Sequence, residues 1–445
     1  MRKLIQKIRA NRFVSAVLVL MSGTALGQVI GLLTTPIVSR IYATSAYGEY
    51  ALFVSVAAIL ATVSQAGLGS AIMVPDEDHD AKLVFNSAFL FMGAFLCLSI
   101  IVLVILSPWV QVFSFGDPYV LSLLALAAHL LFLNASNLLR IFVNRMRMYK
   151  VLFWNSIISA SATLVITIPL GLLGWGSWGF IIAGIAGNAV CCAQMLARIN
   201  PFLRICWADF KQVFVTYKKF TFFQLPSNMV ETLAQQTPNQ ILEATFGSAS
   251  LGSYSMSNKI LGIPSRLIAS PVNQVYFRTA VDLHDDTKRL AKFSLGLVQK
   301  IYLVAAPLII ILIAFGEPVF SFVLGGQWAE AGTIAAMLSF QYVFIFCTTC
   351  MSYCRVALNR QGTNLIMSCV SLSVIVLSFV IGICFFDSLL SVLACYAVGS
   401  CLVAIVDLTL DFICMKSCYA KFLITTVVFV LIVGSLGLLL RFLCG

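Results

Sequence analysis

The sequence predicts an all-α polytopic membrane protein, and three observations carry this prediction. Hydrophobic residues make up 60% of the 445-residue chain and charged residues only 10%, whereas a soluble domain has about 25% charged residues. The mean hydropathy is +1.00. About thirteen apolar stretches are long enough to cross roughly 30 Å of hydrocarbon at about 1.5 Å per residue. Because no polar stretch exceeds roughly 25 residues, we expect no separate soluble domain.

The apolar stretches define the expected transmembrane helices in chain order. We expect spans at 13–37, 47–73, 83–106, 119–143, 151–172, 177–197 and 220–246, followed by 251–276, 293–315, 332–356, 364–386, 389–414 and 422–443. The first apolar run follows a basic segment, MRKLIQKIRANR, and is too long for a signal-peptide core, so we expect it to be retained. The outer loops should be short, and the longest is expected at 316–331.

The distribution of Lys and Arg predicts the orientation of the chain. If the N-terminus is cytoplasmic, 23 of the 28 basic residues lie in inner segments, and only Arg40 and Arg441 lie in outer ones. Basic residues concentrate in cytoplasmic loops, so we expect a cytoplasmic N-terminus. The net charge of +11 therefore reflects membrane topology, and we expect no nucleic-acid partner.

The longest inner loop divides the first twelve helices into six and six. We expect an N-terminal six-helix lobe at 1–200, a cytoplasmic or interfacial linker at 201–219, a C-terminal six-helix lobe at 220–415 and a thirteenth helix within 416–445. The linker sequence RICWADFKQVFVTYKK mixes aromatic and basic residues, so it is either an interfacial helix or a solvated connection.

The two halves also resemble each other. The second helix begins SAYGEYALF and the eighth begins SLGSYSMSN, and each places Gly, one residue and Tyr near its outer end. This pattern is either a chance similarity or the sign of a parallel repeat. Parallel repeats are found in secondary transporters that bind substrate near the bilayer midplane.

Enzymatic chemistry has no support in the sequence. The chain lacks HExxH, GxSxG, GxGxxG and P-loop motifs, so we expect no catalytic residue. Most of the 14 cysteines lie in apolar runs, as Cys191, Cys192 and Cys347 do. We expect them to be buried thiols rather than disulfides or metal ligands, and we expect neither a metal nor a cofactor.

The candidate site centres on the stretch from Phe220 to Ala280. Its two predicted helices contain prolines, which should bend them, and charged side chains, which cost about 2.5–3.5 kcal/mol each at the bilayer centre. Such residues normally face a cavity or a partner, so we expect a wet cleft for a polar substrate. The polar residues that we single out within the predicted spans are Gln28, Gln65, Glu231, Gln235, Gln236, Lys259, Arg266, Lys300, Gln341 and Asp407.

The basic members of this set favour phosphate as a ligand, because Arg and Lys are its usual partners. Lys259 and Arg266 are seven residues apart, so they should project from nearly the same helix face about 10 Å apart. The alternative is a set of structural ion pairs, either Glu231 with Lys259 or Asp407 with Lys300. The glutamines could equally join helices by hydrogen bonds.

Three stretches between residues 27 and 280 resemble one known family. GQVIGLLTTPIVSRIYATSAYGEYALF, AIMVPDEDHDAKLVFNSAF and LGSYSMSNKILGIPSRLIASPVNQVYFRTA are similar to bacterial polysaccharide (O-antigen, Wzx-type) flippases. These belong to the multidrug/oligosaccharidyl-lipid/polysaccharide (MOP) exporter superfamily. The chain departs from that family in having Lys259 where arginine is expected and in its thirteenth helix.

The resemblance implies a MATE/MOP-like fold, with twelve core helices in two lobes around a central cavity. It implies a flippase that moves undecaprenyl-diphosphate-linked oligosaccharide across the bacterial inner membrane by alternating access. The partners would be that lipid-linked substrate, membrane lipid, a polysaccharide polymerase and a chain-length regulator. The alternatives are a cation-coupled multidrug antiporter of the same superfamily and, less favoured because the outer loops are short, a membrane glycan polymerase.

These expectations assign roles to the polar set. Diphosphate contacts are expected from Arg40, Lys259, Arg266 and Lys300, contacts to sugar hydroxyls from Gln28, Gln65, Gln235 and Gln236, and coupling from Glu231 and Asp407. The two acids keep the antiporter alternative open, because a drug antiporter needs an acidic lumen for organic cations.

Overall fold

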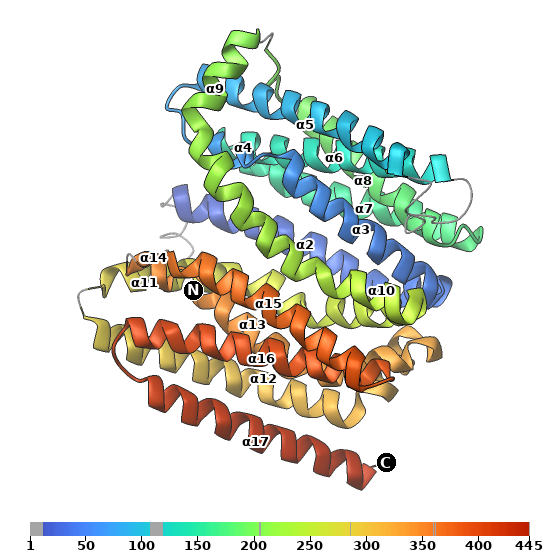
Figure 1. Ribbon diagram of the computed structural model, residues 1–445, viewed down its shortest axis with the longest axis vertical. Coiled ribbons are helices and arrows are strands. Elements are labelled where there is room, and N and C mark those ends of the chain that lie inside the picture. Colours follow the sequence, from blue (N-terminus) through green and yellow to red (C-terminus); the bar gives the residue numbers. More distant parts are fainter. Residues whose placement is uncertain are drawn as a thin grey trace. The chain divides into compact units, whose positions relative to one another are not determined.

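The computed structural model describes residues 12–106, 119–203, 206–284, 286–358, 360 and 362–444, and these residues are almost entirely helical (Figure 1). The predicted all-α polytopic fold is therefore confirmed. Within the described residues, 11 helices are long and apolar enough to cross a membrane. The predicted seventh and eighth spans are helical but more polar. Residues 1–11 of the basic N-terminal segment and residues 204–205 of the predicted linker lie outside the described ranges.

The first half of the chain forms α2 (Arg12–Ile41), α3 (Thr44–Ser64), α4 (Leu68–Ala71), α5 (Asp78–Leu106), α6 (Tyr119–Arg145), α7 (Tyr149–Leu172), α8 (Ser177–Leu196) and α9 (Trp207–Lys219). A π-helical turn, η2 (Phe220–Gln224), leads into α10 (Leu225–Leu261). There follow the π-helical turn η3 (Ser265–Ala269), α11 (Ser270–Asp282), α12 (Thr287–Leu324), the 3-10 turn η4 (Gly326–Trp328), α13 (Ala329–Met351), α14 (Cys354–Ala357), α15 (Gly362–Phe385), α16 (Leu389–Cys414) and α17 (Tyr419–Cys444).

The helices form two compact units. Unit 1 comprises Met1–Tyr42 and Glu49–Gln236, and unit 2 comprises Ala43–Gly48 and Thr237–Gly445. The units divide inside α10 and also separate the first turn of α3 from the rest of that helix. The division expected from the sequence, with lobes at 1–200 and 220–415, lies at the linker instead and remains a prediction.

Unit 1 is held together by close helix packing. α2 packs on α7, α8 packs on both α6 and α7, and α5 packs on α6. The α2–α7 contact depends on Gly23 and Gly27, because a Cβ at Gly23 would lie 2.7 Å from the Cα of Phe153. Two glycines four residues apart let helix backbones approach closely, which is the usual basis of helix association in membranes.

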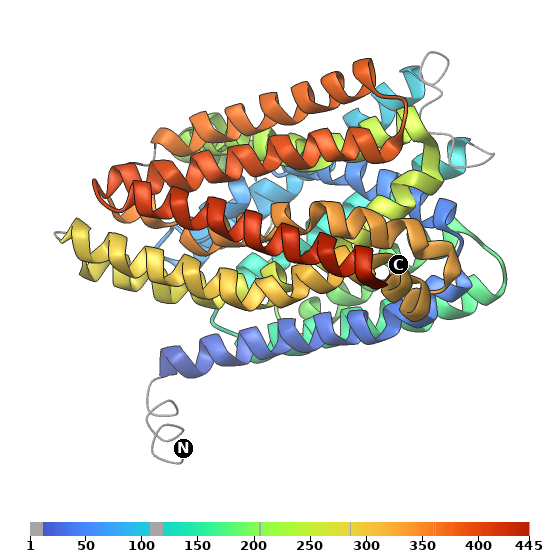
Figure 2. The same cartoon turned by 90° about the horizontal axis from the view of Figure 1, so that it is seen from below.

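Unit 2 is built on α12, α13 and α16, with α15 packed on α16 and α17 packed on α12. Both views show α17 running alongside α12 (Figures 1 and 2). Phe429 of α17 stacks on Tyr302 of α12 with ring centroids 4.1 Å apart, and Thr426 shares a 3.1 Å hydrogen bond with the Tyr302 hydroxyl. The expected thirteenth helix is therefore an integral part of unit 2.

Two predicted boundaries were wrong. The expected span 47–73 is interrupted after Ser64, because Ala66 (φ 49°) and Gly67 (φ 71°) adopt left-handed backbone conformations that end a right-handed helix. The expected outer loop at 316–331 is mostly helical, since α12 continues to Leu324 and η4 follows. There Gly316 and Gly332 pack backbone to backbone, and Trp328 is completely buried.

The linker contains the amphipathic helix α9, as one of its two interpretations predicted. Asp209 accepts a 2.9 Å hydrogen bond from the backbone N–H of Cys206 and so caps the start of the helix. This backbone hydrogen bond lowers the pKa of the Asp209 carboxyl. Val213 is buried against the core of unit 1, whereas Trp207 is exposed. An interfacial position for α9 remains a prediction.

The predicted seventh and eighth spans are separated at Gly247, whose φ of 77° and ψ of 176° interrupt α10. Two prolines of the second of these helices lie beside a helical irregularity, and the bend expected there remains a prediction. Pro264 immediately precedes the π-helical turn η3, and Pro271 lies near the start of α11. Each proline lacks a backbone donor, which favours a local irregularity such as a π-helical turn.

The glycines of the two Gly-x-Tyr motifs, Gly48 and Gly252, lie in unit 2, where the two segments cross. A Cβ at Gly48 would lie 1.8 Å from the carbonyl oxygen of Ser248, and a Cβ at Gly252 would lie 1.9 Å from that of Thr44. Each glycine thus faces the residue four positions before the other glycine. We call this contact the glycine crossing. It is a reciprocal Thr-xxx-Gly and Ser-xxx-Gly pair, in which small residues let two backbones touch.

Candidate functional site

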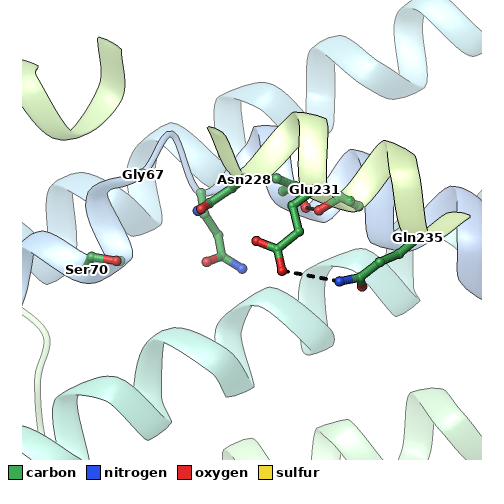
Figure 3. A pocket seen from close by; sticks show the side chains of 9 residues that line it. Gly67, Ser70, Asn228, Glu231 and Gln235 are labelled. Atoms are coloured by element: carbon green, nitrogen blue, oxygen red, sulfur yellow. Dashed lines mark hydrogen bonds between the residues drawn. The ribbon is translucent and has the colours of Figure 1, made fainter. Parts of the chain in front are cut away.

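The candidate site in unit 1 is a polar pocket of about 230 Å³ beside the interruption after α3. Figure 3 shows Glu231 and Gln235 side by side on α10, with Gly67 and Ser70 on the facing segment. The pocket is lined by Thr62, Gln65, Gly67, Gly69, Ser70, Asn228, Glu231, Thr232 and Gln235. We call it the unit 1 pocket.

The break after α3 shapes one wall of this pocket. The left-handed turn at Ala66 and Gly67 releases the chain from helical geometry just as Gln65 leaves α3. The Gln65 amide then donates a 2.9 Å hydrogen bond to Asn134 Oδ1 of α6. Gly69 leaves room for the Gln65 side chain, because a Cβ there would lie 3.3 Å from Gln65 Oε1. Gln65 is therefore held in place by its surroundings.

The other wall is one face of α10. Asn228, Glu231, Thr232 and Gln235 follow the spacing i, i+3, i+4 and i+7, which places them on the same side of a helix. Gln235 Nε2 donates a 3.3 Å hydrogen bond to Glu231 Oε1. Thr232 shares a 3.0 Å hydroxyl contact with Thr62 of α3. The lining therefore consists of amides and hydroxyls with one carboxylate and no basic residue.

The structure brings together Gln65, Glu231 and Gln235 from the predicted set. Gln236 and Gln28 do not line the unit 1 pocket; Gln28 is exposed on α2. Sequence reasoning missed the hydroxyl and asparagine members of the lining. The helical spacing of the polar residues between 228 and 235 was the available signal for Asn228 and Thr232.

A second candidate region lies in unit 2 around Lys259. Lys259 Nζ donates a 2.7 Å hydrogen bond to the Tyr47 hydroxyl. Tyr47 packs edge-on against buried Trp328, with centroids 5.5 Å apart. The first turn of α3 therefore supplies the acceptor for this ammonium group.

Arg266 joins Lys259 in what we call the basic region. Its Nη2 donates to the backbone carbonyl of Lys259, and Gly262 gives the guanidinium space, because a Cβ there would lie 3.2 Å from Nη2. The prediction of two cations about two turns apart was therefore wrong in one respect. The Arg266 side chain reaches back along the helix, and its charge lies at the Lys259 backbone.

The other predicted basic residues lie outside this region. Arg40 is exposed in the last turn of α2, and Lys300 is exposed on α12. The contacts of Lys259 within unit 2 are with an aromatic hydroxyl, and Glu231 in unit 1 bonds to Gln235. The suggested ion pair between Glu231 and Lys259 remains an untested alternative.

Asp407 pairs with Arg355 and not with Lys300, which corrects the second suggested ion pair. Arg355 Nη2 contacts Asp407 Oδ1, and Arg355 Nε lies 2.7 Å from Asp411 Oδ1. Arg355 is only 5% exposed. Although burial lowers the pKa of this guanidinium, Asp411 and Asp407 hold it above the ordinary value. The sequence analysis counted Arg355 only among the 23 basic residues of the inner segments and overlooked Asp411, because these partners are more than fifty residues apart.

No metal centre or disulfide emerges within the described ranges. No three His, Cys, Asp or Glu side chains there are grouped closely enough to hold a metal ion. The cysteines from Cys97 to Cys418 are free. Cys191, Cys347 and Cys350 are buried as expected, whereas Cys97, Cys206, Cys369 and Cys384 are exposed.

Comparisons with known proteins identify the family. Residues 37–333 match the family model described as "Polysaccharide biosynthesis protein". The succinoglycan biosynthesis transport protein ExoT of Rhizobium meliloti (strain 1021) is 25% identical over 325 residues, which are 72% of this chain and 65% of that protein. The chain thus spans less than two thirds of this relative. The predicted resemblance to a family of polysaccharide biosynthesis proteins is confirmed.

Solved structures support the predicted MATE/MOP-like fold. The lipid II flippase MurJ in an inward closed conformation matches with a TM-score of 0.67 at 14% identity, covering 95% of this chain and 96% of that one. An inward-facing multidrug resistance MATE family transporter of the MOP superfamily matches with a TM-score of 0.62 at 13% identity, covering 90% and 94%. At these identities the similarity shows the fold alone, and the predicted fold class is confirmed.

Proposed function

The chain belongs to the polysaccharide biosynthesis protein family, and from this premise we propose that it is a flippase for undecaprenyl-diphosphate-linked oligosaccharides. Such a substrate carries sugar hydroxyls, a diphosphate and a lipid tail. A flippase must replace the water around the first two groups while the tail remains in lipid. It needs hydrogen-bonding groups and cations at membrane depth, and no bond has to be made or broken.

The observation that carries this proposal is the presence of both kinds of surface on one chain. The unit 1 pocket offers amides, hydroxyls and one carboxylate, which can exchange hydrogen bonds with sugar hydroxyls. The basic region offers an ammonium and a guanidinium, which suit a diphosphate. Lys259 and Arg266 are therefore assigned to the diphosphate, with Arg40 and Lys300 as further contacts along the route.

The sugar contacts of the proposed mechanism are Gln65 and Gln235 in the unit 1 pocket, with Gln28 and Gln236 outside it. Transport proceeds by alternating access. Glu231 is the stronger coupling candidate of the two predicted acids, because it lines a pocket open to an ion or substrate. Asp407 is already engaged by a buried arginine, so a coupling role there requires that contact to break.

One observation favours a second candidate, a cation-coupled multidrug antiporter. Glu231 is the sole carboxylate in a pocket whose lining has no basic residue, and a carboxylate attracts organic cations. The two candidates differ in cells. Loss of an antiporter increases sensitivity to cationic drugs and leaves surface glycan unchanged, whereas loss of a flippase depletes surface glycan.

The protein is a multi-pass membrane protein, and we place it in the bacterial inner membrane with its N-terminus in the cytoplasm. The positive-inside distribution of basic residues supports this orientation. A polysaccharide polymerase and a chain-length regulator would act on the exported product, so we include them as proposed partners.

The decisive experiment is deletion of the gene, followed by analysis of the lipid-linked glycan. We expect undecaprenyl-linked repeat units to accumulate on the cytoplasmic side and surface glycan to fall. Complementation with the intact gene should reverse both effects. Unchanged surface glycan, together with greater sensitivity to cationic drugs, would favour the antiporter.

A further inference from the structure

Several polar atoms of the unit 1 pocket have hydrogen-bonding capacity that the protein does not use. Glu231 accepts from Gln235 through Oε1, and no described residue bonds its second carboxylate oxygen. Asn228 accepts a 2.9 Å hydrogen bond from Gln224 through Oδ1, which leaves the N–H groups of its amide available. The Ser70 hydroxyl is exposed at the pocket wall. The pocket therefore presents unused donors and acceptors side by side.

The two threonines add a further acceptor. Thr62 donates its hydroxyl hydrogen to the carbonyl oxygen of Ala58 at 2.9 Å, so in the 3.0 Å contact between Thr62 and Thr232 the donor is Thr232. A hydroxyl has one hydrogen and two lone pairs, so Thr232 keeps acceptor capacity but no free hydrogen. The lining therefore combines unused donors with unused acceptors. Such a lining suits a ligand whose own groups both donate and accept, as sugar hydroxyls do.

The charge of the lining restricts the ligand further. Glu231 is the sole charged group among the lining residues. Two neighbouring hydroxyls of a neutral sugar can donate to its carboxylate, and hydrogen bonds to an ionised acceptor are the stronger kind. A sugar that carries its own carboxylate or phosphate would instead meet like charge, with no cation in the lining to offset it.

We propose that the unit 1 pocket is a subsite for one uncharged, hydroxyl-rich sugar ring of the transported saccharide. This inference rests on the proposed function and names the substrate class for that part of the site. A volume of about 230 Å³ has room for a single sugar ring. Glu231 is then a residue that selects for sugar charge, and Asn228 is a contact that the sequence analysis did not include.

The test is ligand binding to the purified full-length protein in lipid nanodiscs, measured by saturation-transfer NMR at pH 7.5. The probes are methyl α-glucopyranoside, methyl α-galactopyranoside, methyl β-glucuronide and protonated methyl glucosaminide. We expect the two neutral glycosides to bind and the glucuronide to be excluded. Glu231→Gln should weaken neutral glycosides roughly tenfold, the size expected for loss of a charge-assisted hydrogen bond, and should admit the glucuronide.

Two further variants make the result specific. Glu317→Gln removes an exposed carboxylate on α12, outside the pocket, and should change nothing. Asn228→Leu provides a second test of the pocket, because it should weaken neutral glycosides without admitting the glucuronide. Thermal unfolding of each variant should match the parent protein; if Glu231→Gln unfolds, Asn228→Leu decides the outcome.

The subsite is disproved if the glucuronide binds the parent protein as well as the neutral glycosides, or if neither pocket variant changes their binding. Binding of the protonated glucosaminide alone would also overturn it and would make the pocket a cation site. These outcomes are separate from the gene-deletion experiment. A deletion strain that accumulates lipid-linked repeat units, combined with no glycoside binding, would leave the flippase proposal standing and remove only the subsite.

Discussion

The unit 1 pocket and the basic region use opposite chemistry, and each includes residues from α3 and α10. The pocket combines amides and hydroxyls with one carboxylate and takes Thr62 from the last turn of α3. The basic region combines a lysine and an arginine and takes Tyr47 from the first turn. The comparison teaches that one helix can contribute side chains to two polar regions of opposite charge, one in each unit.

The charged cluster around Arg355 differs from both regions, because its charges are paired within the protein. Arg355 is buried between Asp407 and Asp411 and also donates a 3.1 Å hydrogen bond to Asn364. Its hydrogen-bonding capacity is largely used within the protein. We therefore expect substitutions there to affect folding, and substitutions in the other two regions to affect transport.

The largest expected effect is that of Arg355→Met. Removing one partner of a buried ion pair costs about 3–5 kcal/mol, because the remaining charge is left unpaired. We expect the protein to disappear from membranes, as measured by immunoblotting, and surface glycan to disappear with it. Adding Asp407→Asn and Asp411→Asn should restore part of the protein level. Normal accumulation of the single variant would show that the cluster is not structural.

The next largest effect concerns the basic region. Lys259→Ala and Arg266→Ala should each reduce surface glycan by about tenfold or more, because a charge-assisted contact to diphosphate is lost. The amount of inserted protein should stay the same, and Lys259→Arg should retain activity.

The Glu231→Gln, Lys259→Gln double variant provides the control for Lys259. If the two residues formed a structural ion pair, removing both charges would restore protein level and transport together. Such recovery would rule out Lys259 as a substrate contact.

Much of the fold could be predicted from the sequence, because hydropathy over twenty residues is a local property. The same local reasoning found Gln65 and Glu231 as polar residues within spans. It did not find the turn that exposes Gln65, since an alanine at positive φ such as Ala66 has no sequence signature. It also treated Arg355 as a loop cation, because its acidic partners lie on α16 and only tertiary packing brings them together.

Smaller effects are expected from substituting uncharged side chains of the pocket. Gln65→Leu and Gln235→Leu each remove one neutral hydrogen-bonding side chain, worth about 1 kcal/mol, so transport should fall roughly fivefold. Thr245→Val is the matched control, because Thr245 is exposed on α10 outside the pocket and bonds only to the carbonyl of Ile241. The readout is surface glycan per inserted protein. An effect of the control equal to that of Gln235→Leu would show that α10 is merely sensitive to substitution.

The last prediction concerns membrane topology, and its measurement should leave activity unchanged. It assigns each end of α3 to one side of the membrane. Reporter fusions after Pro75 and Ala208 should be cytoplasmic, and a fusion after Thr44 should be periplasmic, because basic residues are retained inside. The pocket would then adjoin the cytoplasmic end of α3 and the basic region its periplasmic end. A periplasmic signal at Ala208 would reverse this assignment.

The glycine crossing has a consequence for how the first turn of α3 can move. Because Gly48 and Gly252 have no side chains and face backbone carbonyls, no rotamer has to be frozen when the contact forms or released when it parts. Side-chain ordering costs up to about 2 kcal/mol for long residues and nothing for glycine. Forming or separating this contact therefore orders no side chain of either glycine, and the polar interaction beside it is the hydrogen bond between Tyr47 and Lys259.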